Sequence, residues 1–295
     1  MGKLLWQPTE DQIKQSNMVR YMETVNQRYQ QQFESYDDLY RWSVAAIPDF
    51  WASIWDFMEV RASQSYDRVL DDVTKMPGAR WFEGAQLNFA ENLLRYRDDR
   101  TAIIFKGESQ PVQRMTYAEL YDAVSRVASA LRESGVTVGD RVVGFMPNMP
   151  QTIIAMLAAT SLGATWSSCS PDFGIKGVLD RFGQIQPKVL FTANGYSFKG
   201  KSIDCLVRIR QILAQLPSIE RVVVVPYTEP TPDIGDVPHA VSYDAFIAAH
   251  PGGTIDFAQL PFDHPLYIMY SSGTTGLPKC MVHGAGGTLI QHLKE

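Results

Sequence analysis

The sequence predicts an α/β protein in which a mainly parallel sheet, covered on both faces, follows a helical N-terminal extension. Three observations support this prediction. From Thr101 onward, short apolar strand-like segments alternate with helical ones. One of these segments, residues 222–225, is apolar throughout, as expected for a strand buried on both faces. The preceding region, up to about Arg97, is rich in aromatic residues and helix formers and has few β-branched runs.

Residues 1–97 are expected to form the helical extension, packed on the rest of the chain. Pro48 is placed as in the first turn of a helix. Aromatic and aliphatic side chains then recur at helical spacing and predict one apolar face. A stripe of this kind is more typical of a docking face than of a ligand site. The residues of the stripe are Phe50, Ile54, Trp55 and Met58.

Residues 98–295 are expected to form a second, α/β domain. Its first helix should begin at a capping box made by Thr116 and Glu119 and end at Gly135. We expect further helices at residues 150–163, 174–184 and 205–213. We expect strands at residues 102–106, 141–146, 165–168, 188–193, 222–225 and 266–270, the last closing the series.

Composition excludes several classes of function. A net charge of −5 argues against a general electrostatic grip on nucleic acid or anionic lipid. The three cysteines, Cys169, Cys205 and Cys280, are far apart and predict neither a disulfide framework nor a zinc site. The N-terminus lacks the apolar run of a signal peptide, and residues 152–166 are too few to span a bilayer. We therefore expect a soluble, cytoplasmic protein without metal-ligating residues in this chain, a nucleic-acid partner or stable membrane association.

Residues 267–279 are the most informative segment, because an apolar strand leads into a loop of hydroxyls, glycines and one lysine. Glycine permits positive φ and lets backbone N–H groups converge on a ligand. Hydroxyls add neutral donors, and lysine adds a mobile charge suited to phosphate oxygens. A flexible surface loop is the alternative for such a composition. The position directly after a buried strand, without acidic residues, favours a polyphosphate site.

This loop matches neither of two common nucleotide motifs. For a Walker A loop, Gly273 and Gly276 are too close together, and Lys279 is followed by Cys280. A GxGxxG dinucleotide fingerprint is also absent at this position.

The loop instead resembles the signature phosphate loop of the adenylate-forming superfamily, whose members activate a carboxylate with ATP and transfer the acyl group to a thiol. The resemblance implies that the loop holds the β- and γ-phosphates as pyrophosphate departs. The residues implied are Ser271, Ser272, Gly273, Thr274, Thr275, Gly276 and Lys279.

A finer resemblance extends over nearly the whole chain. Residues 37–43, 87–94, 166–174 and 265–295 are similar to the acetoacetyl-CoA synthetase family, and residues 166–174 distinguish it best from acetyl-CoA synthetases. The resemblance implies acetoacetate, ATP and CoA as substrates, with Mg²⁺. Two alternatives stay open: another short-chain acyl-CoA synthetase, and a noncatalytic fragment that binds a nucleotide or a partner. Taken alone, residues 166–174 suggest only a strand end and a turn.

Two further segments are weaker candidates. Lys199, Gly200 and Lys201 correspond to a basic stretch that contacts the nucleotide end of CoA in related acetyl-CoA synthetases. Lysine lacks the fork of the arginine favoured there, and a solvated charge cluster is an equal alternative. In residues 283–287, Gly286 and Gly287 are expected to let a helix start approach closely, and His283 is expected to be a hydrogen-bonded structural residue.

The family pattern continues beyond Glu295. The resemblance places there the rest of the acyl pocket, the adenine, ribose and Mg²⁺ contacts, and the catalytic lysine, so no catalytic residue is assigned in this chain. Residues 289–295 have no helix stop signal, which favours an interrupted chain. We therefore expect this chain alone to make no acetoacetyl-CoA. We also expect it to leave apolar sheet faces uncovered at strands such as residues 222–225.

Overall fold

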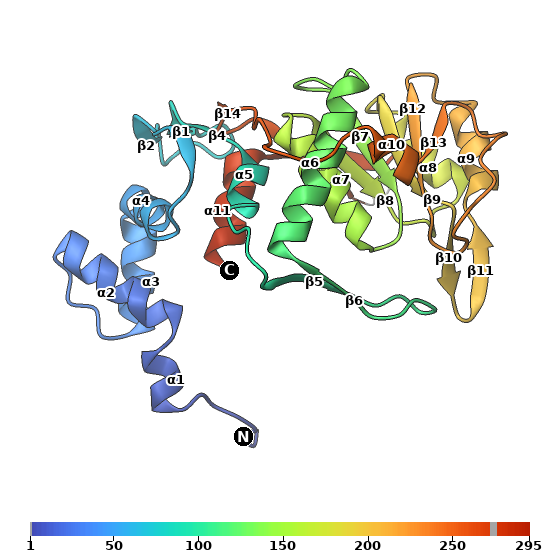
Figure 1. Ribbon diagram of the computed structural model, residues 1–295. Coiled ribbons are helices and arrows are strands. Elements are labelled where there is room, and N and C mark those ends of the chain that lie inside the picture. The colour runs from blue at the N-terminus through green and yellow to red at the C-terminus, as the bar shows by residue number, and fades with distance from the viewer. Residues whose placement is uncertain (1, 272–275) are drawn as a thin grey trace. The chain divides into compact units, whose positions relative to one another are not determined.

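The structure is a computed structural model that describes residues 2–271 and 276–295 (Figure 1). The chain divides into two compact units. Unit 1 comprises Met1–Val60, Tyr66–Gly84 and Ile290–Glu295. Unit 2 comprises Arg61–Ser65 and Ala85–Leu289.

Unit 1 is built mainly from short helices whose starts are set by local sequence. Thr9, Ser16 and Ser35 cap the first three helices by accepting a hydrogen bond from a backbone N–H in the first turn. Pro48 lies in the first turn of the fourth, as predicted. The helices are α1 (Glu10–Lys14), α2 (Asn17–Tyr29), α3 (Tyr36–Ala45) and α4 (Ile47–Phe57).

The expected helical extension is not helical throughout. Within unit 1, strands β2 (Arg68–Leu70) and β3 (Trp81–Glu83) form an antiparallel pair. Nearby residues that belong to unit 2 form strands β1 (Ala62–Gln64) and β4 (Gln86–Leu87). These strands have two or three residues each, too few to show a period in the sequence.

Unit 2 contains a seven-stranded sheet in the order β13-β12-β9-β7-β8-β15-β16. Neighbouring strands are parallel except for the last pair, β15 and β16, which is antiparallel. The predicted, mainly parallel sheet is therefore confirmed. Its strands are β7 (Arg141–Phe145), β8 (Thr165–Cys169), β9 (Val189–Ala193), β12 (Arg221–Val225), β13 (Ala240–Ser242), β15 (Pro265–Ser271) and β16 (Lys279–Gly284).

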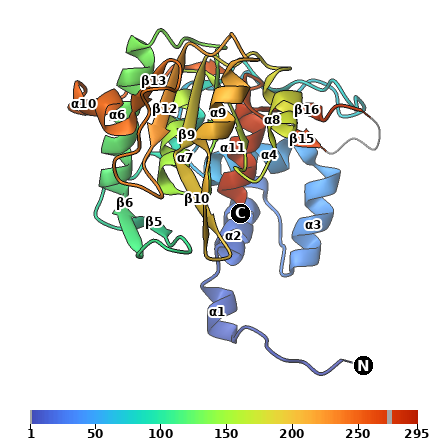
Figure 2. The same cartoon turned by 90° about the vertical axis from the view of Figure 1, so that its right-hand side faces the viewer.

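Helices cover both faces of this sheet, as predicted. Figure 2 shows α6 and α10 on one side of the strands and α8 and α9 on the other. Successive residues of β9 confirm the two faces. Leu190 joins the apolar cluster formed with Phe182 and Ile209, whereas the ring of Phe191 lies 6.0 Å from that of Phe246. The helices are α6 (Tyr117–Glu133), α7 (Pro150–Ser161), α8 (Ile175–Phe182), α9 (Leu206–Leu213) and α10 (Tyr243–Ala248).

The predicted capping box is present at α6. The Thr116 side chain accepts from the Glu119 N–H, and the Glu119 carboxylate accepts from the Thr116 N–H. Gly135, just after the helix, has φ of 78°, as expected for a left-handed stop. The remaining elements of unit 2 are β5 (Thr101–Phe105), β6 (Gln113–Thr116), β10 (Gly195–Phe198), β11 (Lys201–Asp204), β14 (Leu260–Pro261) and α5 (Phe89–Leu93). Helix α11 (Ala285–Lys294) begins in unit 2 and ends in unit 1.

Two expectations about the sheet are wrong. Residues 222–225 are only 0–1% exposed, because both faces of β12 are covered within this chain. The exposed apolar surface lies instead on β15 and β16, where Met269 is 50%, Met281 42% and Val282 59% exposed. The segment 266–270 does not close the series either, since β16 pairs beyond it and forms the edge of the sheet.

Asn88 connects three distant segments of unit 2. Its Nδ2 lies 2.8–3.2 Å from the carbonyl oxygens of Thr160, Ser161 and Ala258, and its Oδ1 accepts from the Glu91 N–H at the start of α5. The residue is 1% exposed, so water is not available to replace these hydrogen bonds. One side chain therefore satisfies backbone groups that lie far apart in sequence.

Replacing Asn88 with alanine should destabilise unit 2. We expect Asn88→Ala to lower the free energy of unfolding by roughly 1–3 kcal/mol, because buried backbone groups lose their partner. Urea unfolding followed by circular dichroism measures the change, with the exposed Asn148→Ala as the matched control. Equal unfolding midpoints for the two variants would contradict the role of Asn88.

In unit 1, the carboxylate of Asp71 holds the loop that leads to β3. It accepts from Lys75 Nζ at 2.6 Å and from the Arg80 and Asp72 N–H groups at 2.8 Å each, and it is 4% exposed. The hydrogen bond from Lys75, followed by that from Arg80, holds the pKa of Asp71 well below its usual value of 3.8. The charged form is thus the one that the fold favours.

The stability that Asp71 provides should depend on pH. A carboxyl whose pKa is lowered by folding stabilises the fold above its unfolded pKa, and that contribution disappears as the pH falls through the folded pKa. We therefore expect Asp71→Asn to lower the melting temperature of unit 1 at pH 7. The difference from wild type should shrink below about pH 4. Thermal melts from pH 7 to pH 3 test this, with the exposed Glu34→Gln as control; a pH-independent difference would contradict it.

Candidate functional site

The candidate site lies where strands β8 and β15 end. These strands are parallel neighbours, with Trp166 opposite Tyr267 and Ser167 opposite Ile268. The carboxyl ends of parallel strands meet at one edge of a sheet, and ligands of open α/β sheets bind there. The loop after β8, which begins at Ser170, and the predicted phosphate loop after β15 therefore leave the sheet side by side.

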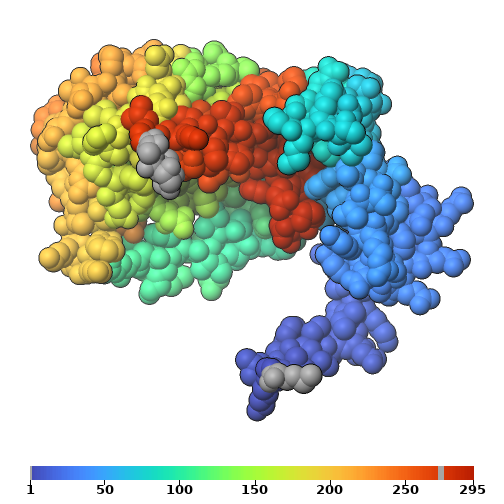
Figure 3. All heavy atoms as spheres, turned by 180° about the vertical axis from the view of Figure 1, so that it is seen from behind, coloured from blue at the N-terminus to red at the C-terminus, as the bar shows by residue number. Residues whose placement is uncertain are grey.

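The predicted phosphate loop connects the two strands of a β-hairpin, which we call the phosphate hairpin (residues 265–284). Ser271 ends β15, Lys279 begins β16, and the two face each other in the antiparallel register. Lys279 is exposed, and Gly276 has φ of 96°, a conformation that favours glycine. Ser272, Gly273, Thr274 and Thr275 lie outside the described residues. Figure 3 shows the hairpin, in red, at the surface beside the yellow-green segment that contains α8.

The loop after β8 is held by neighbouring helices. Its turn is closed by a hydrogen bond from the Phe173 N–H to the Ser170 carbonyl oxygen, and Ser170 Oγ donates to Asp172. Arg208, from α9, donates to the Pro171 carbonyl oxygen at 2.8 Å. This is the stretch that distinguishes the acetoacetyl-CoA synthetase resemblance, and it borders the phosphate hairpin directly.

Two residues at this edge were not found by sequence reasoning. The guanidinium carbon of Arg181, in α8, lies 4.2 Å from the ring centre of Phe173 and 5.6 Å from that of Tyr270. Gln184 Nε2, just after α8, donates to the Pro278 carbonyl oxygen at 2.9 Å. The spacing of Arg181 and Gln184 places both on one side of a helix. Arginine and glutamine are nevertheless common on solvated helix faces, so the sequence carries no specific signal.

Burial makes two of the thiols unreactive. It raises the pKa of Cys169 and that of Cys205 to about 12 each, so both stay protonated near neutral pH. Burial also raises the pKa of Tyr270, whose hydroxyl lies 3.0 Å from Ser167 Oγ. Cys280 is half-buried and lies opposite Tyr270 in the hairpin. The described part of this site thus offers charge and hydrogen-bond donors rather than a thiolate nucleophile.

The candidate CoA residues form the tight turn of a second hairpin. Lys199 and Gly200, with φ of 51° and 74°, connect β10 to β11, and Lys201 begins β11. This geometry is the two-residue turn favoured in β-hairpins. The Gly200 N–H donates to a carboxylate oxygen of Glu108 at 2.6 Å, so an acidic group already occupies the turn.

This turn is not part of the phosphate site. It follows β9, which is separated from β15 by β7 and β8 in the strand order. Strands in a sheet are about 4.8 Å apart, so three spacings amount to roughly 14 Å between β9 and β15. The structure therefore separates the two groups of predicted residues.

Residues 283–287, where β16 ends and α11 begins, agree with only part of the expectation for their two glycines and for His283. Gly286 is required, because a Cβ there would collide with the ring of Phe262. Gly287 has open space around its Cα, so close approach does not explain it. Nε2 of His283 is buried and has no hydrogen-bond partner among the described residues; its ring packs 5.2 Å from that of Tyr267. The expected hydrogen bond of His283 is therefore absent at Nε2.

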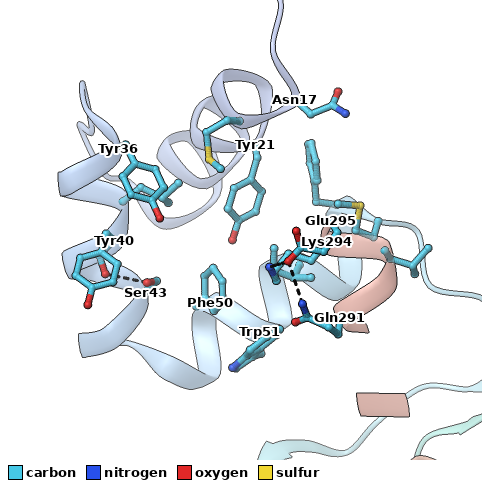
Figure 4. A pocket seen from close by; sticks show the side chains of 16 residues that line it. Asn17, Tyr21, Tyr36, Tyr40, Ser43, Phe50, Trp51, Gln291, Lys294 and Glu295 are labelled. Carbon is cyan, nitrogen blue, oxygen red and sulfur yellow. Dashed lines mark hydrogen bonds and ion pairs between the residues drawn. The ribbon is translucent and has the colours of Figure 1, made fainter. Parts of the chain in front are cut away.

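Unit 1 contains a cavity of about 640 Å³ that sequence reasoning did not predict (Figure 4). Aromatic and aliphatic side chains make up most of its wall, which includes three residues of the predicted apolar stripe, Phe50, Ile54 and Met58. Several of its polar groups already have partners: Lys294 and Gln291 donate to Glu295, and the Tyr21 hydroxyl lies 2.6 Å from Oγ of Ser53, which is not part of the wall. The cavity lacks the accumulation of positive charge that a phosphate site needs.

The described part of the chain contains neither a metal-binding cluster nor a membrane span. Among residues 2–271 and 276–295, no group of three or more His, Cys, Asp or Glu side chains is placed to hold a metal ion. In the same residues, every helix is too short or too polar to cross a bilayer.

Comparison with known families agrees with this arrangement. The model of the AMP-binding enzyme family matches residues 89–294, which include both strands of the phosphate hairpin. The chain belongs to the AMP-binding enzyme family. A second model, acetyl-coenzyme A synthetase N-terminus, matches residues 36–93 of the chain.

Individual relatives narrow the resemblance. Acetoacetyl-CoA synthetase of Macaca fascicularis is 46% identical over 303 residues, which cover 99% of this chain and 44% of the relative. Malonamoyl-CoA synthetase of Penicillium aethiopicum is 39% identical, covering 99% of this chain and 42% of the relative. The solved structure of acetoacetyl-CoA synthetase from Streptomyces lividans matches with a TM-score of 0.91 and 40% identity, covering 99% of this chain and 45% of that one.

These comparisons confirm the resemblance to acetoacetyl-CoA synthetases that the sequence motifs predicted. They also show that the chain spans less than half the length of the relatives it matches.

Proposed function

We propose that the full-length protein is an acid–thiol ligase that converts acetoacetate, ATP and CoA into acetoacetyl-CoA, AMP and pyrophosphate. In the first step a carboxylate oxygen of acetoacetate attacks the α-phosphorus of ATP, and the bond between the α-phosphorus and the bridging oxygen breaks. In the second step the CoA thiol loses its proton, attacks the acyl carbon and displaces AMP. The observation that carries this proposal is the phosphate hairpin at the carboxyl edge of the sheet, in a chain 46% identical to an acetoacetyl-CoA synthetase.

Within this reaction, the contribution of the chain is to bind and stabilise the departing pyrophosphate. Negative charge grows on the leaving group as the bond to the α-phosphorus breaks, and a positioned cation lowers the energy of that state. Lys279 supplies the charge, and the hydroxyl of Ser271 lies opposite it across the hairpin. Ser272, Gly273, Thr274, Thr275 and Gly276 complete the proposed phosphate-binding set.

The proposal assigns different roles to the two predicted parts of the chain. We assign phosphate binding to residues 98–295 and treat residues 1–97 as a separate extension. Lys199, Gly200 and Lys201 remain candidates for the nucleotide end of CoA, where each lysine offers a point charge. The carboxylate of Glu108 at the turn opposes a phosphate there. This second assignment therefore has less support than the first.

Mg²⁺ belongs to the proposal as an ion bound together with the phosphates of ATP. Among residues 2–271 and 276–295 no group of three or more metal-binding side chains is placed to hold a metal ion, so no Mg²⁺ ligand is assigned in this chain. The identity of the acid substrate, acetoacetate, is also part of the proposal.

The similarity to a malonamoyl-CoA synthetase supports another short-chain acid as the alternative substrate. A noncatalytic role of this chain by itself is the other alternative.

Removing the charge at the hairpin should slow the first step. In the full-length protein, we expect Lys279→Ala to reduce acetoacetate-dependent exchange of pyrophosphate into ATP by about 100-fold, as for other lost transition-state contacts. Lys176→Ala is the matched control, because Lys176 is exposed and pairs with Asp180 in the surface of α8. Equal exchange rates for wild type and Lys279→Ala would remove Lys279 from the phosphate role.

The acid can be tested separately. We expect the full-length protein to have a higher kcat/KM for acetoacetate than for acetate or malonamate, measured as AMP release in the presence of CoA. The reason is the similarity of the whole chain, including residues 166–174, to acetoacetyl-CoA synthetases. Equal kcat/KM values for acetoacetate and acetate would reject this substrate and leave the family assignment unchanged.

A further inference from the structure

Helix α8 and the residues just after it contact both ends of the segment that connects the strands of the phosphate hairpin. At the far end, Gln184 Nε2 donates to the Pro278 carbonyl oxygen at 2.9 Å and to the Asp180 carbonyl oxygen at 2.6 Å. Both hydrogens of the amide are therefore used. One bond anchors the side chain to its own helix, and the other reaches the residue before Lys279.

At the near end, Arg181 contacts Tyr270, the residue before Ser271. The Arg181 guanidinium carbon lies 5.6 Å from the Tyr270 ring centre and 4.2 Å from that of Phe173, both within the range of cation–π attraction. Nη1 donates to the Gly177 carbonyl oxygen at 2.7 Å, which holds the side chain against its helix. Within the described residues, the guanidinium pairs with no carboxylate.

Tyr270 is held at its other end as well. Its hydroxyl lies 3.0 Å from Ser167 Oγ, which itself lies 2.8 Å from the Ile268 carbonyl oxygen. Successive residues of a strand point to opposite faces. Fixing the Tyr270 side chain on the α8 face therefore sets the direction in which Ser271 leaves the sheet on the other face.

We infer that Arg181 and Gln184 are positioning residues that hold Tyr270 and Pro278, the described residues on either side of the proposed phosphate-binding segment, and so support pyrophosphate binding. Arg181 acts through Tyr270 and Gln184 acts through Pro278. This role rests on the proposed phosphate role of residues 271–279. The physical reason is preorganisation: a binding segment whose ends are already held loses less conformational freedom when the ligand arrives.

Arg181 also links the loop after β8 to the end of strand β15. Its guanidinium contacts Phe173, in the loop after β8, and Tyr270, at the start of the phosphate segment. Arginine suits this place because its flat guanidinium stacks on aromatic rings, whereas the lysine ammonium is a compact point charge.

The test uses the 295-residue chain and two measurements on each variant. The first is hydrogen–deuterium exchange, without ligand, of peptides covering residues 276–284. The second is the Kd for inorganic pyrophosphate, measured by calorimetry. Gln215→Leu is the matched control for Gln184→Leu. Like Gln184, Gln215 lies just after a helix, in this case α9, and its Nε2 donates to the carbonyl oxygen four residues earlier, that of Gln211.

Gln184→Leu should speed exchange in residues 276–284 by about three- to tenfold and raise the Kd for pyrophosphate by a similar factor, as expected from one lost hydrogen bond. Gln215→Leu should change neither quantity. Lys279→Ala should raise the Kd without changing the exchange, because Lys279 is assigned to the ligand rather than to the support. This difference separates a positioning residue from a binding residue.

Arg181 is tested at the other end of the segment. Arg181→Leu should speed exchange in residues 265–271, and Arg181→Lys should restore part of the protection, because it keeps a cation near the two rings. Unchanged exchange in both Arg181→Leu and Gln184→Leu would overturn the positioning role. Failure of the wild-type chain to bind pyrophosphate, with the exchange effects present, would instead overturn the phosphate role and with it the function assigned to these contacts.

Discussion

The parallel pairing of β8 with β15 is the constraint on which the rest of the site depends. The two strands are about a hundred residues apart in sequence, and Ser167 Oγ lies 2.8 Å from the Ile268 carbonyl oxygen where they meet. Because the strands point the same way, their following loops leave from one edge. Helix α8 connects β8 to β9 and packs, together with α9, on one face of the sheet. From there its end contacts the loop after β8 through Phe173 and the loop after β15 through Pro278. Through this arrangement Arg181 contacts Tyr270 of β15 as well as Phe173.

Local chemistry made much of the fold predictable. The Thr116–Glu119 capping box and the Gly135 stop are set by residues within one helix, and both are present in the structure. The strand at residues 222–225 was recognisable because a run of four valines within an α/β pattern is typical of a strand buried on both faces. The phosphate segment was predicted for a similar reason. Its glycines, hydroxyls and lysine form a local pattern that needs no knowledge of tertiary contacts.

The features that were missed depend on contacts between distant residues. Strand β16 mixes Lys279, Met281 and His283 on one side, and this pattern does not alternate cleanly between apolar and polar. It becomes a strand because β15 lies beside it. The covering of β12 was misjudged for the related reason that helix contributions to a sheet face depend on topology, which a single segment does not contain. Arg181 and Gln184 belong to the same class, since their partners come from other segments.

The composition of the phosphate segment explains why it needs support from outside. Glycine loses more backbone freedom on folding than any other residue, so a segment with Gly273 and Gly276 is costly to order. Adding bulky side chains would reduce that cost but block the approach of backbone N–H groups to a phosphate. The contacts of Arg181 and Gln184 restrict Tyr270 and Pro278, the described residues on either side of the glycine-containing loop. Tyr270 and Pro278 are suited to this task, since one offers a large ring and the other a fixed φ and a backbone carbonyl that accepts from Gln184. In the proposed function the glycines are assigned to the ligand, and the flanking residues are assigned to holding the ends of the loop.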